Sequence, residues 1–98
     1  MQKTTLMQQE AAEIVAIQAL TWLAADDEML QSFLGATGAG VDDLRDRAQD
    51  VAFLGAILDF LLINDDWVIG FCDANGLPYS APMSARQCLP GGEAINWT

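Results

Sequence analysis

The segment Leu20–Gly38, LTWLAADDEMLQSFLGATG, returns about 38 positions later as Leu58–Gly76, LDFLLINDDWVIGFCDANG. The two segments align without a gap, and leucine, aspartate, phenylalanine and a closing glycine recur at matching places. Each has the order of an apolar helix, an oxygen-bearing cap, a second helix and a glycine at which that helix ends. The repeat predicts two tandem helical units, related by approximate two-fold symmetry, that pack long helix against long helix. A chance similarity is the alternative.

Apolar periodicity, caps and breaks predict that the whole chain, residues 1–98, is one all-α domain. We expect five to six helices in a compact orthogonal bundle, at residues of about 6–25, 27–36, 42–49, 51–63, 65–74 and 81–88. The fourth of these is apolar on nearly every side and is expected at the centre. The repeat units then cover about residues 6–48 and 51–88, and residues 89–98 form a tail.

The composition indicates a folded protein that avoids polyanions. Hydrophobic residues make up 52% of the chain and charged residues 18%, which is ample material for a core. Fourteen acidic residues against four basic ones give a net charge of −10. Phosphate backbones and anionic membrane surfaces repel such a chain, so nucleic acid and membrane are not expected partners. The acidity serves solubility or attraction to a basic partner protein.

The N-terminal residues carry no uninterrupted apolar segment of the kind found in export signals, so we expect a cytoplasmic location. The longest apolar run, Val51–Ile63, is about 13 residues, whereas a membrane-spanning helix needs about 20. Cys72 and Cys88 are too far apart for a C-x-x-C motif, and in a reducing compartment they are expected to remain thiols.

The residue types needed for most catalytic chemistry are missing from the sequence. The chain contains no histidine, the commonest general base and neutral metal ligand. No glycine pair follows a strand and opens a helix, as a phosphate-binding loop requires. The acidic runs at residues 26–28 and 64–66 are better explained as helix caps than as ligands of a cation. We therefore predict no catalytic, cofactor-binding or metal-binding residue, no cofactor and no small-molecule ligand.

Asp59 is the one charged residue within the apolar run Val51–Ile63. It is interpreted either as part of a thin exposed strip or as a buried carboxylate paired with Arg86 or Arg47. A buried carboxylate would have a raised pKa, which suits acid or base chemistry. An enzyme or metal protein is therefore favoured only if Asp59 is buried beside Arg86 in a pocket.

Four large apolar residues are candidates for an interaction surface. Ile14 and Ile17 interrupt the polar strip of the first helix, and Ile95 and Trp97 follow a Pro-Gly-Gly break in the tail. Tryptophan is favoured at binding hot spots. The tail either folds back into a groove of its own domain, anchors a partner or a second copy, or is disordered.

Taken together, the segments VAIQALTWLA, SFLGATG with DDLR, VAFLGAILDFLL, DDW-x-x-x-F-C and LPGG-x-x-x-NWT resemble a family of short alphaproteobacterial proteins catalogued as a domain of unknown function. The resemblance covers nearly the whole chain. It implies a small soluble helical protein of the cytoplasm, without an assigned activity, cofactor or catalytic residue, and it includes the tail in the pattern.

The function expected from these observations is binding without catalysis, as a protein-interaction module or a subunit of a small oligomer. The alternative is an acidic decoy that occupies the basic groove of a nucleic-acid-binding protein, and a carboxylate-based enzyme or metal site ranks third. A decoy requires the carboxylates to gather on one face.

Overall fold

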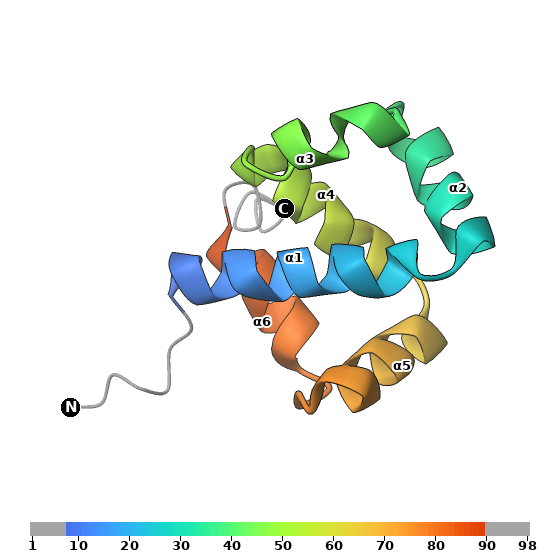
Figure 1. The fold of residues 1–98 in the computed structure, drawn as a ribbon. Helices are drawn as coiled ribbons and strands as arrows, with labels where there is room; N and C mark the ends of the chain where they lie inside the picture. Colours follow the sequence, from blue (N-terminus) through green and yellow to red (C-terminus); the bar gives the residue numbers. More distant parts are fainter. Residues whose placement is uncertain (1–7, 90–98) are drawn as a thin grey trace, which may run out of the picture.

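The computed structural model describes residues 8–89, which form six α-helices and one short 3-10 helix without any β-strand (Figure 1). The predicted all-α fold is confirmed. In chain order the elements are α1 (Gln9–Ala24), α2 (Asp27–Thr37), η2 (Val41–Asp43), α3 (Leu44–Arg47), α4 (Val51–Leu62), α5 (Asp65–Asn75) and α6 (Ala81–Cys88).

The predicted third helix is the least regular part of the fold. Instead of one helix over residues 42–49, the chain makes the 3-10 turn η2 and then only four residues of α3. Neither element contains a buried residue, and Leu44 is half-buried against the core. With so little apolar surface to bury, this segment lacks the packing that stabilises longer helices.

Side-chain oxygens cap α2 and α5 in the same way. The backbone amides of Glu28 and Met29 donate to Asp26 Oδ1 at 3.0 and 3.2 Å. At α5, the amides of the two residues following Asp65 donate to Asn64 Oδ1 at 2.8 and 3.4 Å. Each cap thus satisfies two amides that have no partner within their helix.

Both capped helices end at a glycine in the left-handed region. Gly38 has φ of 75° and Gly76 has φ of 66°, and the amide of each donates to a carbonyl of the last helical turn. A side chain is strained at this φ, which explains why glycine closes both helices.

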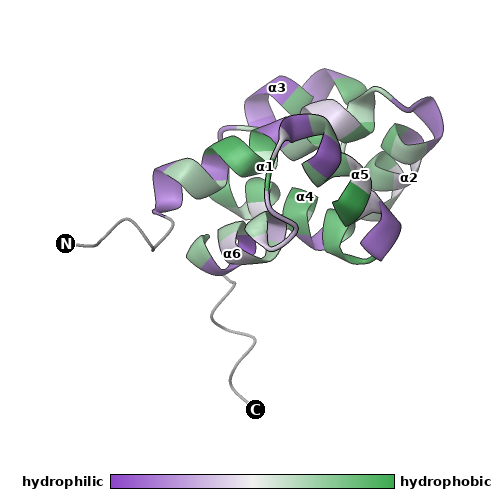
Figure 2. Cartoon of the chain, turned by 90° about the horizontal axis from the view of Figure 1, so that it is seen from below, coloured by the Kyte–Doolittle hydropathy of each residue, from purple (hydrophilic) through white to green (hydrophobic). Residues whose placement is uncertain are grey.

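The core lies where α1 packs on α4, with α6 against both of them. α1 also contacts α2 and α5, and α4 likewise contacts α5 and α2. Figure 2 shows the hydrophobic residues concentrated in α4 and hydrophilic ones in α3. The buried residues of α4 are mostly large, whereas α1 buries mainly small ones, namely Ala12, Val15, Ala16, Ala19 and Leu23. Small side chains allow neighbouring helices to approach α1 closely.

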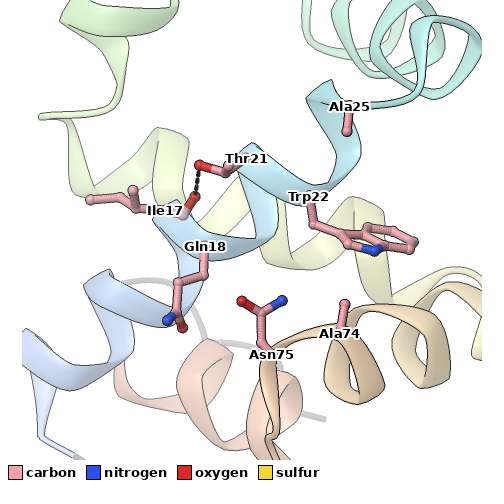
Figure 3. A pocket seen from close by; sticks show the side chains of 7 residues that line it. All are labelled: Ile17, Gln18, Thr21, Trp22, Ala25, Ala74 and Asn75. Carbon is pink, nitrogen blue, oxygen red and sulfur yellow. Dashed lines mark hydrogen bonds between the residues drawn. The ribbon is translucent and has the colours of Figure 1, made fainter.

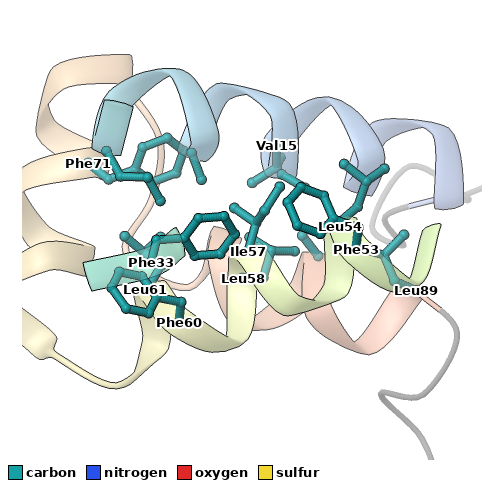
Figure 4. Close-up of a cluster of buried hydrophobic side chains, with 14 of the residues drawn as sticks. Val15, Phe33, Phe53, Leu54, Ile57, Leu58, Phe60, Leu61, Phe71 and Leu89 are labelled. Atoms are coloured by element: carbon teal, nitrogen blue, oxygen red, sulfur yellow. The ribbon is translucent and has the colours of Figure 1, made fainter. Parts of the chain in front are cut away.

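Aromatic rings join α2 and α5 to the core. Phe33 of α2 is edge-on to Phe53 and Phe60 of α4, with ring centroids 5.6 and 5.3 Å apart (Figure 4). Phe71 of α5 is edge-on to Trp22 of α1 at 6.2 Å. Phe33 and Phe71 are fully buried, so these contacts combine apolar burial with the preferred geometry of aromatic pairs.

The predicted bounds of the repeat units and the tail stay a prediction. Leu89, the first residue of the predicted tail, follows the end of α6 and is only 1% exposed, so it belongs to the core. The core contacts of this part of the chain therefore continue one residue beyond Cys88, where α6 ends. The candidate interaction residues Ile95 and Trp97 lie outside the described residues.

We predict that Asp26→Ala and Asn64→Ala each lower the free energy of unfolding by about 1 kcal/mol, because each removes an oxygen that satisfies two amides. Urea denaturation of the two variants measures these losses. The matched control is Gln31→Ala at an exposed position within α2, which should change stability little. A loss at one cap without a comparable loss at the other would contradict the similarity of the two helix starts.

Candidate functional site

The side of α1 that faces away from the core carries exposed isoleucines. Ile14 is 58% exposed and Ile17 is 44% exposed, and Thr21 follows at the next helical spacing. Residues at i, i+3 and i+7 share one face of a helix. The alanines that α1 buries lie on the opposite side. We call Ile14, Ile17 and Thr21 the outer face of α1; their role in binding stays a prediction.

A shallow pocket of about 390 Å³ adjoins this face, between α1 and the end of α5 (Figure 3). No charged side chain lines it, and its lining residues are Ile17, Gln18, Thr21, Trp22, Ala25, Ala74 and Asn75. The hydroxyl of Thr21 donates to the carbonyl of Ile17 at 3.1 Å, and the amide nitrogen of Asn75 donates to the carbonyl of Phe71 at 3.0 Å. The pocket is therefore neutral, with its polar groups partly occupied by their own helices.

Trp22 reaches this position because α5 has a glycine beside it. A Cβ added to Gly70 would lie 3.0 Å from Cζ2 of the indole, closer than side-chain carbons normally approach. The indole is thus wedged against α5, while its other edge meets the ring of Phe71. This contact fixes α5 relative to the outer face of α1.

The charges on the two helices that form the pocket are all negative. α1 carries Glu10 and Glu13, and α5 carries three aspartates, with no basic residue in either helix. The amide of Gln9 donates to Glu13 Oε2 at 3.0 Å. Summed over the surface, these carboxylates attract cationic groups to the region of the pocket.

Asp59 is not a buried carboxylate. Its side chain is 54% exposed, and its Oδ1 accepts a hydrogen bond from Nε of Arg86 at 2.6 Å. The partner is Arg86 of α6, one of the two arginines considered for this role. Asp59 lies on the narrow strip of α4 that faces water, so its carboxylate is solvated. Catalysis by this carboxylate was expected only if Asp59 were buried beside Arg86 in a pocket, and it is not buried.

Arg86 is the more buried member of the pair, with a side chain 13% exposed. Its guanidinium lies over Gly55, where an added Cβ would come within 3.0 Å of Nη1. Gly55 therefore makes room for the guanidinium as α6 packs on α4. The other arginine considered, Arg47, lies over the ring of Phe53 at 5.8 Å, a cation–π distance.

Two further polar contacts lie around the turn after α5, and sequence reasoning missed both of them. The thiol of Cys72 donates to the carbonyl of Pro78 at 3.3 Å, and burial, followed by the charge of Asp73, raises its pKa. The hydroxyl of Tyr79 donates to Asp73 Oδ1 at 2.8 Å, and this bond, with the carboxylate's charge, raises the pKa of Tyr79. A raised thiol pKa lowers the thiolate fraction, so Cys72 is poorly suited to nucleophilic chemistry.

Within residues 8–89, no group of three or more potential ligands is placed to hold a metal ion. None of the helices in that part of the chain is both long and apolar enough to cross a membrane.

Sequence reasoning identified part of this site. Ile14 and Ile17 were selected because they interrupt a polar strip, but the contributions of Trp22, Ala74 and Asn75 were missed. These three residues come together only through the packing of α5 on α1. The one signal in the sequence is Gly70, a small residue within a helix that also contains large apolar side chains.

Comparison with known proteins shows that the chain belongs to the family described as "Protein of unknown function (DUF3572)", whose model matches residues 9–92. The match includes every described helix and ends before Ile95 and Trp97. No curated protein and no solved structure matches the chain.

We predict that Arg86→Ala destabilises the fold more than Asp59→Ala does. The exposed carboxylate contributes about 0.2–1 kcal/mol through the ion pair, whereas loss of the packed arginine costs about 1–3 kcal/mol. Urea denaturation compares both with Arg45→Ala, an exposed arginine whose loss should have little effect. Equal losses at Asp59 and Arg86 would show that the ion pair, and not the packing, dominates.

Proposed function

We propose that this member of the DUF3572 family is a small protein-interaction module without catalysis, which binds through the outer face of α1 and the adjoining pocket. The observation that carries the proposal is the exposure of Ile14 and Ile17, at 58% and 44%, beside a pocket without charged lining. Clustered apolar groups on a surface that is otherwise rich in charge are typical of docking sites.

The energetics favour a partner at this position. Fully burying an exposed isoleucine side chain is worth about 1.5–3 kcal/mol. Ile14 and Ile17 still expose 58% and 44% of their surface, so a partner gains about half of that value at each. The pocket provides a place next to them for one further side chain of the partner. The pocket lies against Trp22, whose indole packs on Gly70 and Phe71 of α5, and this packing gives the partner a preformed surface.

We further propose that the two halves of the domain are copies of one helical pair. Support comes from a reciprocal aromatic contact: Trp22 meets Phe71 edge-on at 68°, and Phe60 meets Phe33 edge-on at 70°. Trp22 aligns with Phe60 in the repeat, and Phe33 aligns with Phe71. Exchanging the two halves therefore exchanges the two contacts, as a two-fold relation requires.

Hydrogen bonds at the ends of α2 and α5 support the same relation. Thr37 Oγ1 donates to the carbonyl of Phe33 at 2.9 Å, and Asn75 Nδ2 donates to the carbonyl of Phe71 at 3.0 Å. The two donors align in the repeat, as do their acceptors. Thr21 and Asp59, also aligned, are both exposed. These matching contacts at aligned positions favour a duplication over a chance similarity.

The other functions considered find less support. Carboxylates occur on every described element except α6, so they do not gather on one face as an acidic decoy requires. Asp59 is half-exposed and does not line the pocket, which leaves a carboxylate-based enzyme without its central group.

The proposal predicts that Ile14→Asp with Ile17→Asp abolishes partner binding without unfolding the chain, because both side chains are exposed in the free protein. Quantitative affinity capture from a cell extract, with the intact chain and this variant as baits, measures the loss. Circular dichroism checks that the variant keeps its helices.

The matched control is Ile63→Asp, which changes another exposed isoleucine, 74% exposed at the end of α4. This variant should retain the partners. A chain that ends at Pro90 separates the contribution of the tail from that of α1. If the double variant captures the same partners as the intact chain, and light scattering shows a monomer in every case, the proposed function is wrong.

A further inference from the structure

We infer that the partner supplies a basic, amphipathic helix that lies along the outer face of α1 in the position that α6 takes along α4. The inference rests on the proposed function and deepens it, since it specifies the chemistry of the partner and the place of its helix. Three observations carry it: the way α6 covers α4, the uncovered counterpart on α1, and the sign of the surrounding charge.

On α4, α6 covers the buried Gly55 and leaves the neighbouring Asp59 54% exposed. The Arg86 guanidinium lies over Gly55, and its Nε donates to the carboxylate of Asp59 at 2.6 Å. Within the repeated segments, Asp59 aligns with Thr21. Continuing the alignment three residues before Leu20 and Leu58 pairs Gly55 with Ile17. These two positions of α4 therefore correspond to the outer face of α1.

Within residues 8–89, no helix covers the corresponding position on α1, and Ile14 and Ile17 there are 58% and 44% exposed. Arg47, which aligns with Arg86 when the repeat is extended by one inserted residue, lies over Phe53 of α4 instead. Thr21 directs its hydroxyl to its own helix, at the carbonyl of Ile17 (Figure 3). In the described residues, α6 thus covers Gly55 of α4, and the equivalent position on the outer face of α1 is open.

α6 also shows what kind of helix fits such a place. It turns small or apolar side chains toward α1 and α4 at a spacing of four residues, with Ala81, Ala85 and Leu89 at 5%, 0% and 1% exposure. An arginine follows directly after the central alanine. Because Ile17 is larger than Gly55, a helix on α1 needs small side chains opposite the isoleucines to approach closely.

The charge selects a foreign helix and not a second copy of this chain. Glu10 lies one turn before Ile14, Glu13 lies beside it, and neither α1 nor α5 contains a basic residue. If two copies met through this face, their carboxylates would come together without a basic residue of α1 or α5 to balance the negative charge. A helix with arginine or lysine beside its apolar row places opposite charges there instead.

The test is a selection of displayed random peptides on the full-length chain, with peptides of 16 residues, the length of α1. Peptides that also bind the Ile17→Asp chain are removed. We expect the enriched sequences to carry small or apolar residues at i, i+4 and i+7 with flanking arginine or lysine. Their affinity should fall by about tenfold or more for the chain with Glu10→Lys and Glu13→Lys, because like charges then meet.

The matched control is Ile63→Asp, which should bind the enriched peptides as the unchanged chain does. Peptides that require Ile17 but are acidic, or that contain proline within the apolar row, would overturn the inference and leave the proposed function standing. If no peptide remains after those that also bind the Ile17→Asp chain are removed, both are wrong. Self-association through this face, or enrichment of the chain's own residues 90–98, would also overturn the basic foreign helix.

Discussion

The packing of α1 on α4 is the contact from which the other features of the structure follow. α1 contributes mostly alanine and α4 contributes large residues, a combination that lets the two helices approach closely. Neither helix can bury its apolar surface within its own half of the chain. Each is completed by the other and by the second helix of the opposite half, as Trp22 with Phe71 and Phe60 with Phe33 illustrate. The helical pairs are therefore mutually dependent, and the fold is a single cooperative core.

The candidate site is a consequence of how that core is closed. α6 packs in the groove between α1 and α4 and covers Gly55 on one side of the domain. The short, polar elements η2 and α3 contain no buried residue. On the outer face of α1, Ile14 and Ile17 stay 58% and 44% exposed. If the two halves are copies, as proposed, the described part of the first half has no covering helix like α6, and the docking site proposed at α1 follows from that difference.

The features that the sequence predicted correctly depend on local interactions. Asp26, Asn64, Gly38 and Gly76 act within one helical turn, so their residue types alone identify where helices begin and end. The features that it left open depend on the placement of distant segments. The packing of the helices alone decides whether Asp59 is buried and which arginine it contacts. The same packing brings Ala74 beside Trp22. The burial of Leu89 has the same origin, because it comes from a core formed by residues far from it in sequence.

The most direct test of this account is nuclear Overhauser spectroscopy on the aromatic rings of the full-length protein in solution. The account predicts contacts between the ring protons of Trp22 and Phe71 and between those of Phe60 and Phe33, both at once. These two contacts cross between the halves and cannot arise within either alone. If Phe71 contacts the rings of its own half and not Trp22, or if only one of the two contacts is present, the reciprocal packing of α1 and α4 is wrong.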